Sequence, residues 1–468
     1  MAQKRSRRGR RRVGKPRRVK GRGGKIRLRT VNPKAAGVDV GAEEHWVAIP
    51  PELDETPVRK FGAYTVDLES LADWLKAKGI ETIAMESTGV YWIPLYELLE
   101  ARGFEVKLVD PRRVKNVPGR KTDVLDCQWI QKLHGFGLLN GAYRPPESIC
   151  ELRAYVRQRG MLVGAAGEQI QHMQKSLTQM NIKLQHVLRD VTGVTGLRIL
   201  RALLSGERDA RKLAGLRHER CQHSTGAIAK ALQGNWREEH LFTLRQAVEL
   251  YDIYQEKIAA CEREIDRVLE KLGSQDEEQG GGVSGEKECA RETQSETQAA
   301  LQKMTGVDLT QVPGLDTLSA VGLVSEIGVD MRAWADERHF ASWLGLCPGN
   351  KVSGGKRMSG RTRKCANRAA QILRLAARSL QKTRSALGAF YRRMRSRLGA
   401  PKAITATAHK LAHIVYGMLR ESREYVEVGQ DHYEREYKKR VLESVRRKAA
   451  KLGYNLVQIQ EMIQPKTA

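Results

Sequence analysis

The sequence lacks any apolar run approaching about 18 residues, the length at which a membrane-spanning helix becomes credible. Its N-terminus is positively charged, but no apolar stretch follows, so no signal peptide is predicted. Its seven cysteines are scattered and never spaced as CxxC, which argues against a zinc cluster and favours a reducing cytoplasm. These absences disfavour a membrane protein and a secreted, disulfide-bonded protein.

Acidic residues are absent from residues 1–30, which contain fifteen Lys or Arg. This segment is too charged and too rich in glycine to fold alone, so we expect a disordered basic arm that binds phosphates. The formal net charge of the chain is +28, and +13 remains when those fifteen are subtracted. Such a surplus predicts a polyanionic partner, most commonly nucleic acid, with a solubility effect as the alternative.

Residues 31–149 alternate short apolar strands with helical patterns. Three strand-like segments come first, and helices and strands then follow in turn. This order predicts an α/β layered domain.

Residues 150–272 predict a helical coiled-coil region. Apolar residues recur at alternating steps of three and four from Ile170 to Val191 and from Leu244 to Leu272. These two seams are expected to pair with each other or with another subunit. The pattern gives no assignment for residues 192–238.

The remaining chain divides into three further segments. Residues 273–299 are Gly-rich and acidic and predict a flexible linker. Residues 300–425 predict a second compact unit that is mainly helical and basic. Residues 426–468 predict one charged helix with a short tail.

Four acids in residues 31–149 occupy notable positions: two lie on apolar strands, where burial of a charge costs free energy, and two lie close together on one helix. Asp39 lies within an apolar strand and Glu86 ends another, while Asp123 and Asp126 share one face of a predicted helix. If they converge at the end of a sheet, their oxygens would hold two Mg²⁺ ions about 4 Å apart and support phosphoryl transfer. The alternative is a set of ordinary ion pairs and a helix-start aspartate.

The segment 312–380 combines turns, glycines and cations. Gly314 lies in a Pro-Gly turn before an apolar helix, which favours a helix-hairpin-helix that binds DNA phosphates, or else an ordinary pair of helices. The stretch 349–364 has no acid, and Ser353 precedes two glycines there. A serine in such a loop is usually only a hydrogen-bond donor, since no His or Asp lies nearby to act as its base. The cations placed to bind phosphate are Lys356, Arg357, Arg361 and, on the helix that follows, Arg368.

The motifs GVDVG, AMESTGVYW, VDPRRVKN and KTDVLD together resemble the RuvC-like domain of the DEDD transposases of the IS110 insertion sequences. The resemblance suggests the IS1111 subgroup and covers most of residues 35–425. It implies an RNase H-like fold whose four metal ligands are Asp39, Glu86, Asp123 and Asp126. Residues 1–30 are not part of the family pattern.

The stretch 349–364 resembles the C-terminal transposase domain of the same family, which carries a nucleophilic serine in an SG-containing loop. Ser353 is the match. The spacing from Ser353 to Met358 is shorter than in the family pattern, so Ser359 remains a rival.

The resemblance implies a prokaryotic, cytoplasmic and nucleoid-associated transposase that cleaves and rejoins donor and target DNA. Its implied partners are a structured noncoding guide RNA, the bridge RNA encoded by the element, and further copies of itself as a dimer or tetramer. Two other functions stay open: a RuvC-like junction nuclease acting by metal-dependent hydrolysis, and a nucleic-acid-binding protein without enzymatic activity.

The basic arm should contribute affinity without sequence specificity. Each phosphate that it contacts releases counterions, so deletion of residues 1–30 should flatten the salt dependence of DNA binding. The slope of log K against log salt, measured by fluorescence anisotropy, checks this expectation. An unchanged slope would mean that the arm does not contact nucleic acid.

Overall fold

The computed structural model describes residues 29–110, 123–279, 296–362 and 365–456. They belong to two units, Met1–Arg144 and Pro145–Ala468. Residues 1–28 of the predicted arm lie outside the described residues. Within the described ranges, no helix has the length and apolar character needed to cross a membrane.

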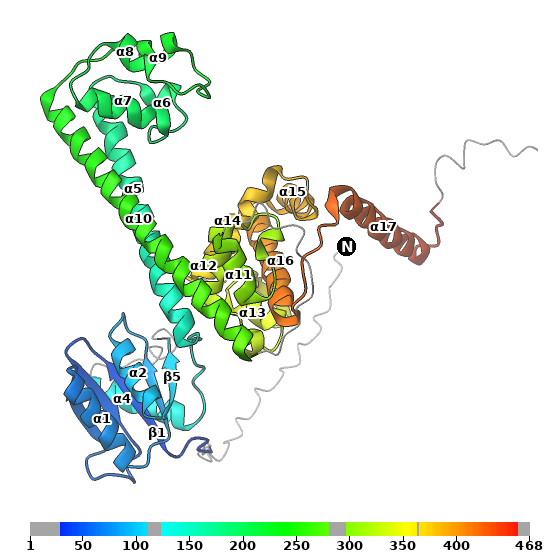
Figure 1. The fold of residues 1–468 in the computed structure, drawn as a ribbon. Coiled ribbons are helices and arrows are strands. Elements are labelled where there is room, and N and C mark those ends of the chain that lie inside the picture. The colour runs from blue at the N-terminus through cyan, green and yellow to red at the C-terminus, as the bar shows by residue number, and fades with distance from the viewer. Residues whose placement is uncertain (1–28, 111–122, 280–295, 363–364, 457–468) are drawn as a thin grey trace, which may run out of the picture. The chain divides into compact units, whose positions relative to one another are not determined.

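The first unit contains a five-stranded mixed sheet (Figure 1). Its strands are β1 (Ala35–Val40), β2 (Glu44–Ala48), β3 (Val58–Gly62), β4 (Thr82–Glu86) and β5 (Glu105–Val109), in the order β3-β2-β1-β4-β5. The pairs β1–β2 and β2–β3 are antiparallel, whereas β1–β4 and β4–β5 are parallel. A three-stranded meander followed by parallel crossovers is the RNase H-like arrangement, so the predicted α/β fold class is confirmed.

Helices cover both faces of this sheet. Helix α1 (Thr65–Ala77) and helix α2 (Trp92–Ala101) share a core with one face, and α1 buries Leu68, Leu71 and Leu75 at helical spacing. Helix α4 (Asp123–Gly135) lies on the other face, where Ile130 packs against Ala84 of β4. All five residues of β4 are buried, as expected of a strand with parallel neighbours and helices on both sides.

The second unit begins with two long helices, α5 (Glu147–Gln179) and α10 (Glu238–Gln279), which pack antiparallel along each other (Figure 1). Leu162 of α5 packs against Ile258 of α10, and Arg159 pairs with Glu262 at 2.7 Å. Met173 and Leu177 of the first seam share a core with Leu244 and Ala247 of the second, so the two predicted seams pair within one chain. Helix α10 continues through residues 273–279, the first part of the predicted linker.

The first seam does not continue as one helix to Val191, and this part of the prediction was wrong. Helix α5 ends at Gln179, and Asn181 adopts a left-handed conformation with φ of 58°. The later seam residues instead enter a small core with α7. The helices of this tip are α6 (Leu184–Val187), α7 (Val194–Leu204), α8 (Ala210–Gly215) and α9 (Thr225–Ala231), and the last three lie within the unassigned residues 192–238.

The rest of the second unit is mainly helical, as expected. Helix α16 is its centre and packs against α13, α14 and α15. Phe340 of α13 is fully buried there and contacts the rings of Trp334 and Tyr416. The elements are α11 (Glu296–Thr305), η1 (Leu309–Gln311), α12 (Thr317–Ile327), η2 (Met331–Ala333), α13 (Glu337–Trp343), β6 (Lys351–Ser353), β7 (Lys356–Ser359), α14 (Arg368–Ser379), η3 (Leu380–Lys382), α15 (Ala386–Leu398), α16 (Ala400–Glu421) and α17 (Gly429–Lys451).

Candidate active site

Asp39 and Glu86 lie side by side on the two central parallel strands of the first unit. The register of β1 and β4 pairs Gly37 with Ala84 and Val38 with Met85, so Asp39 and Glu86 come next on each strand. Residues paired in this way project to the same face of a sheet. Asp39 is half-buried and Glu86 is 3% exposed. Both carboxylates therefore start from neighbouring positions on the face that α4 covers.

Helix α4 approaches this face unusually closely at Gly37. A Cβ atom on Gly37 would lie 2.5 Å from the carbonyl oxygen of Cys127 and closer still to the backbone nitrogen of Gln131. The buried side chain of Gln131 also donates a hydrogen bond of 3.2 Å to the carbonyl oxygen of Ala35. Only glycine permits this contact, so the sequence Gly37-Val38-Asp39 both seats α4 and supplies an acid beside it.

The pKa of the buried Cys127 thiol is affected by the charges of both Asp39 and Asp126. Burial raises the pKa of Cys127 to about 12, and the negative charges of Asp39 and, more weakly, Asp126 contribute to the rise. A charge acts on a thiol in this way only from nearby, so both carboxylates lie within electrostatic range of Cys127. Asp123 is the first residue of α4, and its side chain lies outside the described residues.

The described acids suit a hard divalent cation in their chemistry but do not form a complete site. Carboxylate oxygens are the ligands that Mg²⁺ prefers, and strands β1 and β4 and helix α4 each bring one to this edge of the sheet. Glu86 accepts a hydrogen bond of 3.2 Å from the hydroxyl of Thr88. Across the parts of the chain that the structure describes, no three His, Cys, Asp or Glu side chains lie close enough to hold a metal ion.

Two residues that were not predicted from the sequence, Trp46 and Lys60, lie next to Asp39 across the sheet. Trp46 of β2 is paired with Asp39, and Lys60 of β3 is paired with Trp46, so all three lie on one face. The Lys60 ammonium lies 2.9 Å from Glu44 and 6.0 Å from the centre of the Trp46 ring. The strand pattern of His45-Trp46-Val47 beside the Asp39 strand was the available signal.

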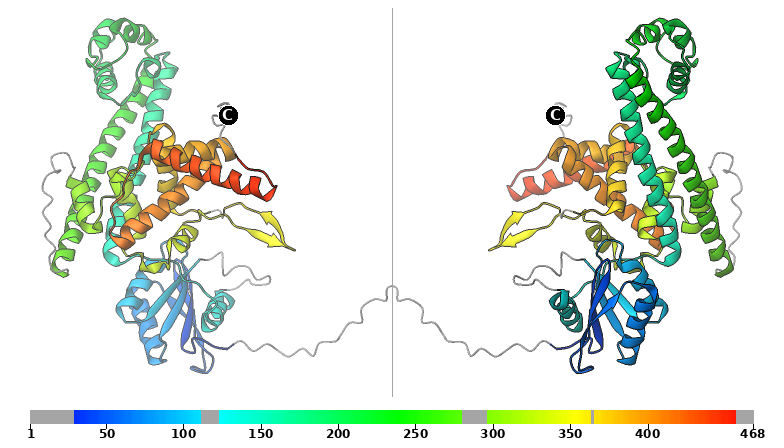
Figure 2. Two further views of the ribbon diagram at one scale, coloured as in Figure 1. Left: turned by 90° about the vertical axis from the view of Figure 1, so that its right-hand side faces the viewer. Right: turned by 90° about the vertical axis from the view of Figure 1, so that its left-hand side faces the viewer.

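Ser353 lies at the tip of a short hairpin in the second unit, formed by β6 and β7. The strands are joined by Gly354 and Gly355, whose φ angles of 55° and 73° fit the two-residue turn that matches strand twist. Ser353 is exposed and pairs directly with Lys356, which is also exposed. Figure 2 shows the hairpin extending away from the helices of this unit. A serine hydroxyl and an ammonium group are thus presented together to solvent.

The rival serine has a different environment at the base of the same hairpin. Ser359 is half-buried, and its hydroxyl oxygen accepts a hydrogen bond of 3.3 Å from the backbone nitrogen of Arg361. The carbonyl oxygen of Arg361 in turn accepts a hydrogen bond of 2.8 Å from the backbone nitrogen of Gly349, which closes the loop. Ser359 therefore helps to fix the loop, whereas Ser353 stands free of the helices at its tip.

The predicted phosphate-binding residues fall into two groups. Arg361 and Arg368 are exposed near the hairpin and at the start of α14, whereas the side chain of Arg357 lies outside the described residues. Gly314 has a φ of 94° and meets the end of α14, since its Cβ would lie 2.7 Å from the carbonyl oxygen of Ala376. Asp316 caps α12 at Ser319 and puts negative charge at that helix start. Phosphate binding at Gly314 stays a prediction, and packing alone explains the glycine.

Two protein-family models match the chain and together span slightly more than half of it. Residues 36–182 match a model of DEDD transposases described as "Transposase", and residues 295–392 match a model described as "Transposase IS116/IS110/IS902 family". The first range contains β1, β4 and α4, and the second contains the β6–β7 hairpin and α14. No curated protein matches the chain.

Replacement of Gly37 by alanine should destabilise the first unit by about 1–3 kcal/mol, because the added methyl group collides with backbone atoms of α4 that cannot rotate away. Urea unfolding followed by circular dichroism measures the loss. Gly135→Ala is the matched control, since a Cβ there makes only ordinary contacts, the nearest at 3.6 Å. Equal stability of the two variants would contradict the close approach of α4 to β1.

Proposed function

The chain belongs to the IS110 family of transposases, and on this premise we propose that it cleaves and rejoins DNA with Ser353 as nucleophile and Mg²⁺ held by its acids. The family gives DNA as the substrate and strand cleavage with recombination as the reaction. The observation that carries the proposal further is the exposed Ser353–Lys356 pair at the tip of a hairpin, inside the range that matches the second family model.

The proposed covalent step conserves phosphodiester bonds. The Oγ of Ser353 attacks a phosphorus atom, the phosphoserine bond forms, and the bond from phosphorus to one strand oxygen breaks. That oxygen leaves with a proton, and the serine proton passes to solvent or to a neighbouring group. A hydroxyl of a second strand then displaces the serine in the reverse sense, so strands are joined without ATP.

The side chains beside Ser353 supply positive charge. Lys356 lies directly across the hairpin, and Arg361 follows within the same loop. Cations that face a phosphate stabilise the additional negative charge that develops in the transition state. The two glycines of the turn have no side chains, which lets a DNA backbone approach the serine.

The acids would hold the divalent metal. Asp39, Glu86, Asp123 and Asp126 are the proposed ligands, and a pair of Mg²⁺ ions bound there would neutralise charge on the attacking and leaving oxygens. The neighbouring thiol of Cys127 stays protonated at neutral pH, because its pKa is raised to about 12, so it adds no charge to the site.

We further propose a guide RNA and self-association. A structured noncoding RNA of the element would choose the DNA sequence by base pairing, and the protein would read the shape of the paired strands. The excess of 82 Lys and Arg over 54 Asp and Glu suits two polyanionic partners. We propose a dimer or tetramer associated with the nucleoid. Sequencing of RNA that co-purifies with the protein, and its mass in sedimentation, test both ideas.

Replacement of Asp39 by Asn together with Glu86 by Gln should lower recombination at least about a hundredfold, because two ligand charges are lost while side-chain shape is kept. DNA binding should persist. Strand exchange on a plasmid pair and anisotropy with labelled DNA measure the two effects. Glu105→Gln is the control, since this exposed acid is the first residue of β5, whereas Glu86 pairs with Val109 at the other end of that strand. Unimpaired recombination by the double variant would exclude the acid site.

Replacement of Ser353 by alanine should abolish both recombination and a protein–DNA adduct that survives denaturing electrophoresis, with folding and binding intact. Ser359→Ala is the matched control and should still form the adduct on a nicked suicide substrate. If Ser359→Ala loses the adduct and Ser353→Ala keeps it, the nucleophile is the other serine. If Ser353→Ala still cleaves DNA at the wild-type rate, metal-dependent hydrolysis by a RuvC-like nuclease becomes the better account.

A further inference from the structure

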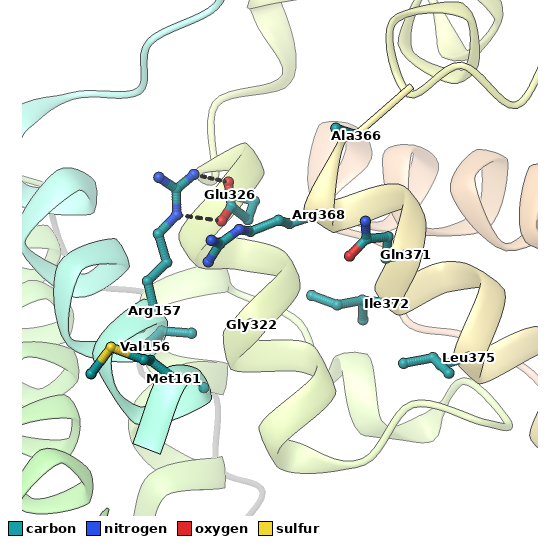
Figure 3. Close-up of a pocket in the computed structure, with 11 residues that line it drawn as sticks. Val156, Arg157, Met161, Gly322, Glu326, Ala366, Arg368, Gln371, Ile372 and Leu375 are labelled. Carbon is teal, nitrogen blue, oxygen red and sulfur yellow. Dashed lines mark hydrogen bonds and ion pairs between the residues drawn. The ribbon is translucent and has the colours of Figure 1, made fainter. Parts of the chain in front are cut away.

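A groove in the second unit lies between helices α5, α12 and α14 (Figure 3). Its cavity volume is about 580 Å³, which is ample for a nucleobase with its sugar and phosphate. Arg368, the first residue of α14, lines one end, and the connection before it leads back to the β6–β7 hairpin. The groove residue Arg368 therefore follows Ser353 by fifteen residues in the sequence.

The floor of the groove contains two glycines, Gly160 and Gly322, which have no side chains. A Cβ atom on Gly160 of α5 would meet nothing within 4 Å, and one on Gly322 of α12 would meet only the end of Ile372, at 3.1 Å. Met161 is 58% exposed and Leu375 is 67% exposed, although both are large apolar residues that line the groove. Solvent-exposed apolar surface concentrated in a cavity favours a ligand with an apolar face.

The other half of the groove has surplus positive charge. Arg157 holds the carboxylate of Glu326 with two hydrogen bonds of 2.9 and 2.8 Å (Figure 3). Arg153 lies 3.6 Å from the same carboxylate and also donates to the carbonyl oxygen of Ser325. Arg153 does not line the groove, so the groove has two cations, Arg157 and the exposed Arg368, against the single carboxylate of Glu326. This end of the groove is complementary to a phosphate.

We propose that this groove binds one nucleotide of a single DNA strand that flanks the phosphate attacked by Ser353, an inference that rests on the proposed function. The base lies on the apolar floor and the phosphate faces Arg157 and Arg368. Gln371 also lines the groove, and its amide offers both a donor and an acceptor to a base edge. A base within a duplex is stacked on both faces, so the groove selects an unpaired nucleotide.

The decisive variant is Gly160→Leu, which fills the floor from α5 without displacing any neighbour within 4 Å of the new Cβ atom. Gly164→Leu is the matched control, because Gly164 lies one turn further along α5, has equally open surroundings and does not line the groove. Both changes replace a helical glycine with a better helix former, so both should keep the fold. The full-length variants are titrated with a fluorescein-labelled single-stranded DNA oligonucleotide in EDTA, which prevents strand chemistry.

Gly160→Leu should weaken binding of single-stranded DNA about tenfold, as expected for loss of one buried contact, and Gly164→Leu should not change it. Arg368→Gln, an exposed substitution that leaves the fold intact, should reduce the salt slope of the same binding by about 0.7. Wild-type affinity for single-stranded DNA in Gly160→Leu overturns the proposal. Weakened binding of a matched RNA oligonucleotide alone also overturns it and assigns the groove to RNA. Because no cleavage is measured, these outcomes are independent of whether Ser353 is the nucleophile.

Discussion

The contact of α4 with β1 at Gly37 is the constraint on which the candidate acid site depends. Asp123 and Asp126 belong to a helix whose backbone lies directly against β1 at Gly37, a strand residue with no side chain. The side chain of Gln131, whose backbone is part of this contact, also donates a hydrogen bond to the carbonyl oxygen of Ala35. The position of the helical acids relative to Asp39 and Glu86 is thus set by close packing of backbone atoms, which tolerates little change in volume.

The second unit uses a different physical principle to position Ser353, the nucleophile proposed above. Its hairpin has a two-residue turn and two short strands, in which Ser353, Lys356 and Met358 are exposed. The positive φ angles of Gly354 and Gly355 fix the turn, and the loop base is closed by the pairing of Gly349 with Arg361. Ser353 is therefore positioned by local backbone geometry and remains accessible, as the proposed attack on a DNA phosphate requires.

Paired charges connect α5, the first long helix of the second unit, to α12. Arg153 and Arg157 of α5 both reach Glu326 near the end of α12, so hydrogen bonds and an ion pair join the start of α5 to α12. The pair Arg157–Glu326 is partly exposed, and its contribution to stability is modest. Its effect is chiefly on geometry, because it sets one wall of the groove beside α14.

The sequence by itself determined the type and local neighbours of each candidate residue. Strand alternation and acid placement gave Asp39 and Glu86, and glycines next to Ser353 marked a turn, because backbone preferences and two-residue or helical periods act over a few residues. Tertiary structure decided the rest. The apolar spacing that predicted a continuous seam to Val191 is equally satisfied by a helix that ends at Gln179 and by residues that fold back into a small core. Likewise, the pairing of Trp46 with Asp39, the effect of the Asp39 charge on Cys127 and the groove lined by Gly160 and Gly322 arise from residues distant in sequence. Such contacts depend on strand order and helix packing, which the local periodicity of a sequence does not predict.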